Sequence, residues 1–462
     1  MSVQAPVFLA AAISMRGIQM IRAFAMISAL VLAAIAAKPA GAAVTVEEVK
    51  SKSGLTAWLV RDRLNPIISM RVLVRNGGAV LDPNGKEGLA RFTASLLDEG
   101  AGELDSQAFQ RRLEDLSISL EFNAGADHLS ISLRTLRRNR AEAFRLLKLA
   151  LTKPRFDKEP VERIRAQMLT SLARRSVRPG YIAGRTFWRT AFPKHPYGRP
   201  TRGTPATIQA IGKADLQAYV KGRVARGALV IGVTGDITPD ELKAALDTTF
   251  AGLPRRATPA AVSRVAPATN GKLTVIRRPF PQSVVIFGQP GPGRKDKDFY
   301  ATYVMNHILG GGSFSSRLYQ EIREKRGLAY SVSSSLSPMR HTAMITGSVA
   351  TQNARVRETI DQIRLQWKRM AEQGVTAQEL KDAKLYLTGS YPLRFVNTAR
   401  IAGSLAWLQM LGLGRDYFER RNAIIEAITV ADVRRAAKRF LDTGKLYFVV
   451  VGQPEGLEDK KG

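Results

Sequence analysis

Arg323 and Tyr330 are the residues of this chain whose types and spacing best suit chemistry on a peptide. They are seven positions apart, and Gly327, a natural helix stop, lies between them. A helix that ends near Gly327 and a strand that opens at Tyr330 can direct both side chains into one cleft. A guanidinium and a phenol hydroxyl can each donate hydrogen bonds to a peptide carbonyl and its developing oxyanion. The alternative is an ordinary surface arginine beside a half-buried strand tyrosine.

A glycine run precedes this pair and comprises Gly310, Gly311, Gly312 and Ser313. One interpretation is a flexible loop that lets the backbone approach a bound peptide. A second is a phosphate-binding loop, but the Lys-Ser/Thr ending and the preceding strand are absent. A third is a simple turn between two helices.

Metal chemistry within this chain has little material to draw on. The sequence has no cysteine and only four histidines, at positions 128, 195, 307 and 341. No two of them are close in sequence, so a zinc site would have to be assembled from distant parts of the chain. We therefore expect no metal and no other cofactor in this chain.

The stretch from Gly310 to Leu318, with Arg323 and Tyr330, resembles the glycine-loop and Arg/Tyr region in the C-terminal half of the pitrilysin, insulysin and mitochondrial-processing-peptidase family. Members of that family are zinc peptidases with an inverted H-x-x-E-H motif. The resemblance covers nearly all of the mature chain. It implies that Arg323 and Tyr330 contact substrate near the zinc of the opposite domain, and that the glycine run lies at the entrance to a peptide chamber.

The resemblance also shows where the zinc motif is missing. Arg91 and Ser95 stand at the positions of the two ligand histidines, and Ala94 stands at that of the general-base glutamate. The third ligand of the family, a carboxylate on a later helix, aligns with Ser171. Arg91 would repel zinc, Ala94 has no acid or base function, and neither serine replaces its counterpart. Hydrolysis by this chain alone is therefore not expected.

A chain that keeps the substrate side and lacks the metal side is typical of a non-catalytic partner subunit. The resemblance implies a heterodimeric zinc peptidase, in which a homologous subunit brings H-x-x-E-H and the zinc. This chain would supply residues that bind peptide substrates and stabilise the transition state. The alternative is a purely structural, peptide-binding or chaperone-like protein of the same fold. A third hypothesis is a basic protein that binds nucleic acid or membranes.

The net charge is strongly positive, with 70 Lys and Arg against 39 Asp and Glu. Such a field can steer acidic peptides, anionic lipid surfaces or nucleic acid towards the protein. No nucleic-acid-binding motif accompanies the basic clusters, so we expect no nucleic-acid partner. A solvated, very basic surface is the simpler interpretation of each cluster.

The N-terminus has the pattern of a secretory signal. Arg16 and Arg22 precede the apolar run from Phe24 to Ala37, and the small residues Ala40-Gly41-Ala42 follow. The run is short for a membrane span, although a retained anchor is the alternative. We predict a signal peptide at residues 1–42, an exported, periplasmic mature chain, and no stable membrane insertion after cleavage.

The chain repeats itself at a distance of 217 residues. The segment 208–215 matches 425–432, and 229–235 matches 446–452. Each pair predicts a helix entered at Ala-Asp and then a strand that ends in glycine. The proline-containing segment 253–270 lacks apolar periodicity and is typical of a linker. These observations predict two homologous peptidase-like domains at 43–252 and 271–462, the first with the lost zinc site.

The expected elements are strands and hairpins mixed with long helices. A strand is expected at 68–74, hairpins at 116–133 and 329–351, and long helices at 158–175 and 355–373. This order predicts an α+β fold in which a mainly antiparallel sheet with flanking helices occurs twice. The resemblance adds the expectation of a clam-like body of the processing-peptidase type.

Overall fold

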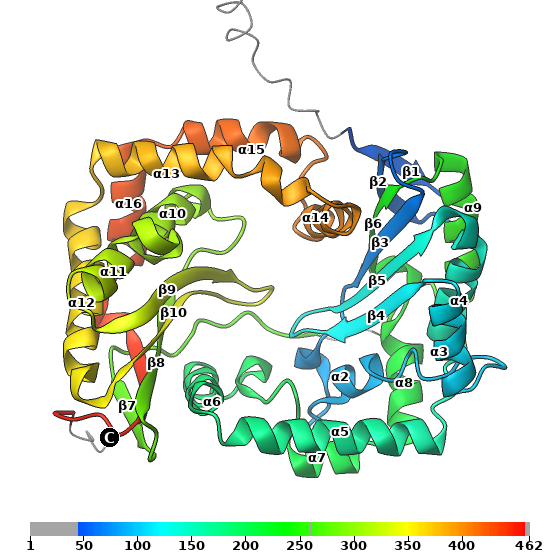
Figure 1. The fold of residues 1–462 in the computed structure, drawn as a ribbon, viewed down its shortest axis with the longest axis horizontal. Coiled ribbons are helices and arrows are strands. Elements are labelled where there is room, and N and C mark those ends of the chain that lie inside the picture. The colour runs from blue at the N-terminus through cyan, green and yellow to red at the C-terminus, as the bar shows by residue number, and fades with distance from the viewer. Residues whose placement is uncertain (1–44, 259–260, 458–462) are drawn as a thin grey trace, which may run out of the picture. The chain divides into compact units, whose positions relative to one another are not determined.

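The computed structural model describes residues 45–258 and 261–457. The predicted signal peptide lies outside the described residues. Of the helices in the described ranges, none has both the length and the hydropathy to cross a bilayer. The residues from Thr45 onward form one compact unit that contains both sheets (Figure 1).

The N-terminal sheet has six strands in the order β1-β2-β6-β3-β5-β4. All neighbouring strands are antiparallel except β2 and β6, which are parallel. Its strands are β1 Glu47–Lys50, β2 Thr56–Arg61, β3 Ile67–Val74, β4 Ser119–Ala124, β5 Leu129–Leu136 and β6 Leu229–Gly235.

The C-terminal sheet has five strands in the order β7-β11-β8-β10-β9, again with one parallel pair, β7 and β11. Its strands are β7 Leu273–Arg277, β8 Gln282–Pro290, β9 Ala329–Pro338, β10 Ala343–Gln352 and β11 Tyr447–Gly452. The predicted α+β class with two similar, mainly antiparallel sheets is therefore confirmed. The single parallel pair makes each sheet mixed.

The helices flank these sheets in two sets. The first set is α2 Leu89–Ala94, α3 Ser106–Asp115, α4 Arg140–Thr152, α5 Lys158–Ser176, α6 Pro179–Ala191, α7 Pro205–Ala210, α8 Lys213–Arg223 and α9 Pro239–Phe250. The second set is α10 Phe299–Asn306, α11 Arg317–Tyr319, α12 Val356–Gln373, α13 Ala377–Gly389, α14 Thr398–Met410, α15 Tyr417–Glu426 and α16 Val430–Phe440.

The internal repeat found in the sequence is visible in three dimensions. Helices α8 and α16 begin with the same device, because Asp215 and Asp432 each accept a hydrogen bond from the backbone N–H three residues earlier. The strands that follow, β6 and β11, occupy equivalent places, each between a parallel and an antiparallel neighbour. The repeated sequence therefore specifies a repeated helix and central strand.

Two helices pack against the sheet of the other half of the chain. Helix α14 lies on β3 and β6 of the N-terminal sheet, and α6 lies on β8 and β11 of the C-terminal sheet (Figure 1). The Ser69 and Thr398 hydroxyls are 2.8 Å apart, and Gln409 donates to the carbonyl of Ile231. On the other side Phe187 stacks on Tyr447 with 5.6 Å between ring centroids. Each of these helices therefore covers the sheet of the other half.

Gly232 allows the close contact of α14 with β6. A Cβ atom at Gly232 would lie 2.3 Å from the carbonyl oxygen of Ala402 and 2.7 Å from the backbone nitrogen of Ala406. Both atoms belong to the backbone of α14, so they cannot move aside without moving the helix. A side chain at this position would therefore separate the helix from the sheet.

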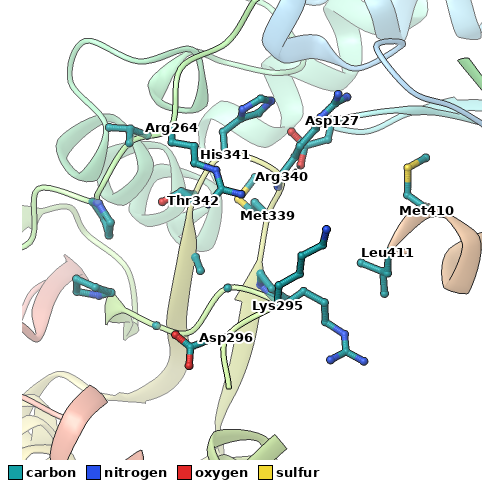
Figure 2. A pocket seen from close by; sticks show the side chains of 18 of the residues that line it. Asp127, Arg264, Lys295, Asp296, Met339, Arg340, His341, Thr342, Met410 and Leu411 are labelled. Atoms are coloured by element: carbon teal, nitrogen blue, oxygen red, sulfur yellow. Dashed lines mark hydrogen bonds between the residues drawn. The ribbon is translucent and has the colours of Figure 1, made fainter. Parts of the chain in front are cut away.

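The tips of two hairpins meet between the sheets. Tyr197 donates a 2.6 Å hydrogen bond to Asp127 in the β4–β5 turn, and its hydroxyl accepts from the backbone N–H of His341 in the β9–β10 turn. Asp127 also accepts from the backbone N–H of Arg340. A pocket of about 820 Å³ lies beside these contacts, and Figure 2 shows it with Asp127, Arg340 and His341 in its wall.

Candidate functional site

Arg323 and Tyr330 are brought into direct contact by the fold. The Arg323 guanidinium carbon lies 4.5 Å from the centroid of the Tyr330 ring, within the range of a cation–π interaction. Gly327, with a φ of +58°, ends the helical segment between them, as expected. Tyr330 is 81% exposed on the edge strand β9. The two side chains therefore lie side by side on one surface.

Tyr319 completes this arrangement and was missed in the sequence. Its ring centroid lies 4.9 Å from the Arg323 guanidinium carbon, so the guanidinium contacts two tyrosine rings. Phe314 packs edge-on against Tyr319 at 5.0 Å and is itself 69% exposed. The spacing of four residues between Tyr319 and Arg323 on one helical segment is the signal that would have found the contact.

The helical segments around these residues are irregular. Arg323 lies in a π-helical turn, Gln320–Glu324, and a second π-helical turn spans His307–Gly311. Such turns are rare and occur often at functional sites. The flexible-loop interpretation is therefore wrong for Gly310 and Gly311, which belong to the second turn. Gly312 and Ser313 follow it, and Ser313 has a φ of +48°.

Gly310 is required by packing. A Cβ atom there would lie 2.5 Å from the hydroxyl oxygen of Ser334 and 2.7 Å from a methyl carbon of Leu318. Ser334 donates to the Asn306 side chain at 2.8 Å, and the Asn306 amide donates back to the Ser334 carbonyl. The buried glycine thus lets the turn pack against β9. The next helix begins seven residues later, at Arg317.

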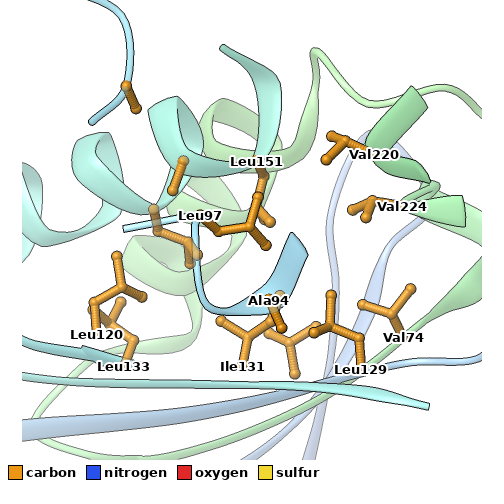
Figure 3. Packing of buried hydrophobic residues seen from close by; sticks show 14 of the residues in the cluster. Val74, Ala94, Leu97, Leu120, Leu129, Ile131, Leu133, Leu151, Val220 and Val224 are labelled. Atoms are coloured by element: carbon orange, nitrogen blue, oxygen red, sulfur yellow. The ribbon is translucent and has the colours of Figure 1, made fainter. Parts of the chain in front are cut away.

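The positions of the lost zinc motif lie on the short helix α2. Ala94 is 2% exposed and faces the apolar core above β5, where Figure 3 shows it near Leu129 and Ile131. Ser95 ends the helix and donates to the carbonyl of Arg91 at 3.2 Å. The position of the general base is therefore taken by the buried methyl group of Ala94. The position of the second histidine ligand is taken by Ser95, whose hydroxyl caps the helix.

Arg91 is a half-buried charge that forms no ion pair with the residues that the structure describes. Its Nε is buried and has no hydrogen-bond partner among the described residues. Burial, reinforced by the charges of Arg202 and Arg175, lowers the pKa of Arg91 to about 10. Ser171 on α5, which aligns with the third zinc ligand of the family, accepts a hydrogen bond from the Nε of Arg175. This position therefore also lies next to the cationic cluster. A zinc ion does not fit these residues, because they add positive charge where the metal would need anionic or neutral ligands.

Asp98 and Glu99, the carboxylates that follow α2, are respectively buried and paired with another residue. Glu99 binds Arg163 at 2.6 Å and accepts a hydrogen bond from Ser106. Burial raises the pKa of Asp98 to about 6, and the neighbouring Glu99 charge adds to this. In the described ranges no group of three or more His, Asp or Glu side chains is arranged to hold a metal ion.

The four histidines lie in different surroundings. His195 and His341 flank Tyr197, with centroid distances of 4.9 and 6.2 Å. His307 stacks on Tyr386 at 5.1 Å, and His128 contacts Trp407 edge-on at 5.0 Å. Burial lowers the pKa of His128 and of His307. Each of the four histidines thus packs against an aromatic ring.

The candidate site can therefore bind and polarise a carbonyl oxygen. Arg323 is a permanent cation with five donors, and Tyr330 presents its hydroxyl at the surface. The Arg323 side chain is 31% exposed, and its ion pair with Glu324 is loose, with 3.6 Å between Nε and Oε1. These donors remain accessible to a partner molecule, whereas α2 supplies no group that could activate water.

Comparison with known proteins agrees with this arrangement. Residues 210–387 match the family described as the peptidase M16 inactive domain. The chain is 30% identical over 395 residues to the non-peptidase homolog YmxG of Helicobacter pylori, covering 84% of this chain and 90% of the relative. It is also 30% identical over 293 residues to an uncharacterized zinc protease of Mycobacterium leprae, covering 62% and 64%.

Solved structures of similar proteins have the same fold. A crystal structure of a peptidase M16 inactive domain from Pseudomonas fluorescens superposes with a TM-score of 0.83 and 28% identity, covering 90% of this chain and all of that one. A protease from Helicobacter pylori has the same fold, with a TM-score of 0.81 at 18% identity and 88% coverage of this chain, 99% of the other. The resemblance noted in the sequence is confirmed: this chain belongs to the M16 peptidase family, as a non-catalytic member.

Proposed function

We propose that this chain is the non-catalytic subunit of a heterodimeric zinc peptidase. A homologous subunit would bring H-x-x-E-H and the zinc ion. This chain would bring Arg323 and Tyr330 to the partner's active site and help to bind extended peptides. The zinc of the partner would activate the attacking water, and no metal is needed in this chain.

The observation that carries the proposal is the stack of Tyr319, Arg323 and Tyr330. Its outer member, Tyr330, is 81% exposed, so its position cannot be explained by burial in the core of this chain. Both rings contact the guanidinium, and the loose ion pair with Glu324 leaves its donors available. Such pre-oriented donors suit a carbonyl oxygen whose negative charge grows during attack.

The same proposal assigns the chain to an exported compartment. The pattern of Arg22, the apolar run Phe24 to Ala37 and the small residues up to Ala42 supports removal of a signal peptide. Edman sequencing of the protein recovered from the periplasm should begin near Ala43. A first residue before Phe24 would contradict export by cleavage.

The function is tested by reconstitution. Peptide hydrolysis and zinc content are measured for this chain, for the zinc-motif homologue from the same cell, and for their mixture. We expect activity that requires both chains, with zinc only in the homologue. Arg323→Ala and Tyr330→Phe should lower kcat about a hundredfold, the usual effect of removing one oxyanion donor, while size-exclusion chromatography still shows the complex. Arg369→Ala, which removes an exposed arginine from α12, is the matched control.

Two results would change this conclusion. Hydrolysis and stoichiometric zinc in this chain alone would mean that the interpretation of Arg91, Ala94, Ser95 and Ser171 is wrong. A complex whose turnover is the same with Tyr330→Phe and Arg323→Ala as with the native chain would favour the alternative, a purely structural or peptide-binding partner.

A further inference from the structure

The pocket between the two sheets is built from segments far apart in the sequence. The linker contributes Arg264, the loop after β8 contributes Lys295, and the β9–β10 turn contributes Arg340 (Figure 2). Arg75 follows β3, and Trp407 belongs to α14. The volume of about 820 Å³ is within the range of sites for small organic molecules. This pocket does not include Arg323 or Tyr330.

The charges that line this pocket are unbalanced. Five cations face it, and in the described part of the chain none of the five forms an ion pair. They are Arg75, Arg264, Arg294, Lys295 and Arg340. Burial and the nearby Arg340 charge lower the pKa of Arg75, as expected for cations without counter-charges.

The two carboxylates of the pocket offset only a small part of this charge, because Asp296 is already paired with Arg439 and Asp127 is a single acid among five cations. Asp296 is held by Arg439, with contacts of 2.8 and 2.9 Å. Asp127 accepts hydrogen bonds from the Tyr197 hydroxyl and from the backbone N–H of Arg340. Both acids are thus engaged in contacts that hold the fold together.

Several of the cations have neutral partners that leave donors free. Arg340 donates to the Asn76 side chain at 2.9 Å, and Arg294 donates to the Tyr300 hydroxyl at 2.8 Å. Arg264 and Lys295 form neither hydrogen bonds nor ion pairs with the described residues, and both side chains are exposed. Figure 2 shows Lys295 extending into the pocket.

The remaining wall is apolar. Val265, Pro290 and Met339 line it together with Met410 and Leu411 from the end of α14. Trp407, which is 45% exposed, adds an aromatic surface beside them. An inorganic anion would leave this wall in contact with water, whereas a ligand with an apolar part would cover it.

We propose that this pocket binds an organic anion that carries a carboxylate on an apolar body. The carboxylate would lie among Lys295, Arg340 and Arg264, and the apolar body would lie against Trp407 and the end of α14. A fatty acid and a short acidic peptide share this chemistry, and the binding experiment separates them. The site is distinct from that of the proposed peptidase function and does not depend on it.

The position of Trp407 provides a direct measurement of binding. The full chain is titrated with decanoate, with decanol, with acetyl-Leu-Leu-Glu and with the amide acetyl-Leu-Leu-Gln-NH₂, and tryptophan emission is recorded. We expect saturable changes with at least one of the two carboxylates, little change with the uncharged analogues, and weaker binding at higher salt. Trp407→Phe should abolish the change in emission, which separates this signal from that of the other three tryptophans.

The requirement for positive charge is tested with variants that replace one cation of the pocket, and with a matched control outside it. Lys295→Gln and Arg264→Gln should each weaken binding about five- to tenfold, because each loses one charge-assisted contact. Lys297→Gln changes an exposed lysine of the same loop that does not line the pocket, so its affinity should stay that of the native chain. Circular dichroism confirms that each variant is folded.

Every outcome bears on the proposal. Binding of decanoate only identifies a lipid-like ligand, and binding of the peptide only identifies an acidic peptide; either result supports it. Equal binding of charged and uncharged probes would overturn it, as would the same loss with Lys297→Gln as with Lys295→Gln. Failure of both carboxylates to bind would overturn it as well.

Discussion

Arg91→Met should stabilise the folded protein, because the native side chain is a poorly solvated cation that no anion compensates. Its Nε has no acceptor in the described part of the chain, and Arg202 and Arg175 add like charge. Methionine has a similar length and retains the packing of the aliphatic stem. The substitution therefore removes the charge and leaves most of the apolar contact.

The size of the gain follows from the lowered pKa. One pKa unit corresponds to about 1.4 kcal/mol, so a pKa lowered to about 10 sets an upper bound near 3 kcal/mol on the penalty. Part of the side chain still reaches water, which reduces the expected gain to about 1–2 kcal/mol. A base with a lowered pKa is destabilising while it is charged. The gain should therefore be the same from pH 5 to pH 8 and should begin to decline only above pH 10.

Urea unfolding monitored by circular dichroism measures this gain. The control is Arg174→Met, which removes the same charge from an exposed position on α5. Because both variants lower the net charge by one, general relief of charge repulsion is the same in both. We expect Arg174→Met to remain within about 0.5 kcal/mol of the native chain. An unfolding free energy for Arg91→Met that does not exceed that of Arg174→Met would refute the reasoning.

Two further changes test other features of the fold. Burial raises the pKa of Asp98 to about 6, so the folded protein is less stable when this carboxyl is charged, above pH 6, than when it is protonated. Asp98→Asn should therefore raise the free energy of unfolding by about 2–3 kcal/mol at pH 8 and by almost nothing at pH 4, measured in parallel urea titrations. An equal gain at both pH values would contradict this. Gly232→Ala should cost about 1–3 kcal/mol because its Cβ meets the backbone of α14, whereas Gly389→Ala, with open space around it, should cost nothing in the same thermal scans. Equal melting temperatures would show that α14 can shift without loss.

The candidate site was only partly predictable. Arg323 and Tyr330 could be paired from their spacing and from the helix stop at Gly327, because both signals are local. The contact of Arg323 with Tyr319 and the buried π-helical turn at Gly310 depend on how these segments pack against β9. Glycine spacing alone does not distinguish an open loop from a packed turn.

The sequence by itself determined the elements, the repeat and the loss of the zinc motif. Capping residues such as Asp215 and Asp432 act within one helical turn, and strand alternation acts over a few residues, so both can be identified locally. The absence of histidine at positions 91 and 95 likewise requires only the alignment of one helix.

Tertiary structure alone decided which distant segments came together. The exchange of α6 and α14 between the sheets, the desolvation of Arg91 and the cationic pocket around Lys295 all depend on contacts between residues far apart in the sequence. Such contacts are determined by the packing of whole helices on sheets, to which each residue contributes a small part. No local pattern in the chain encodes them.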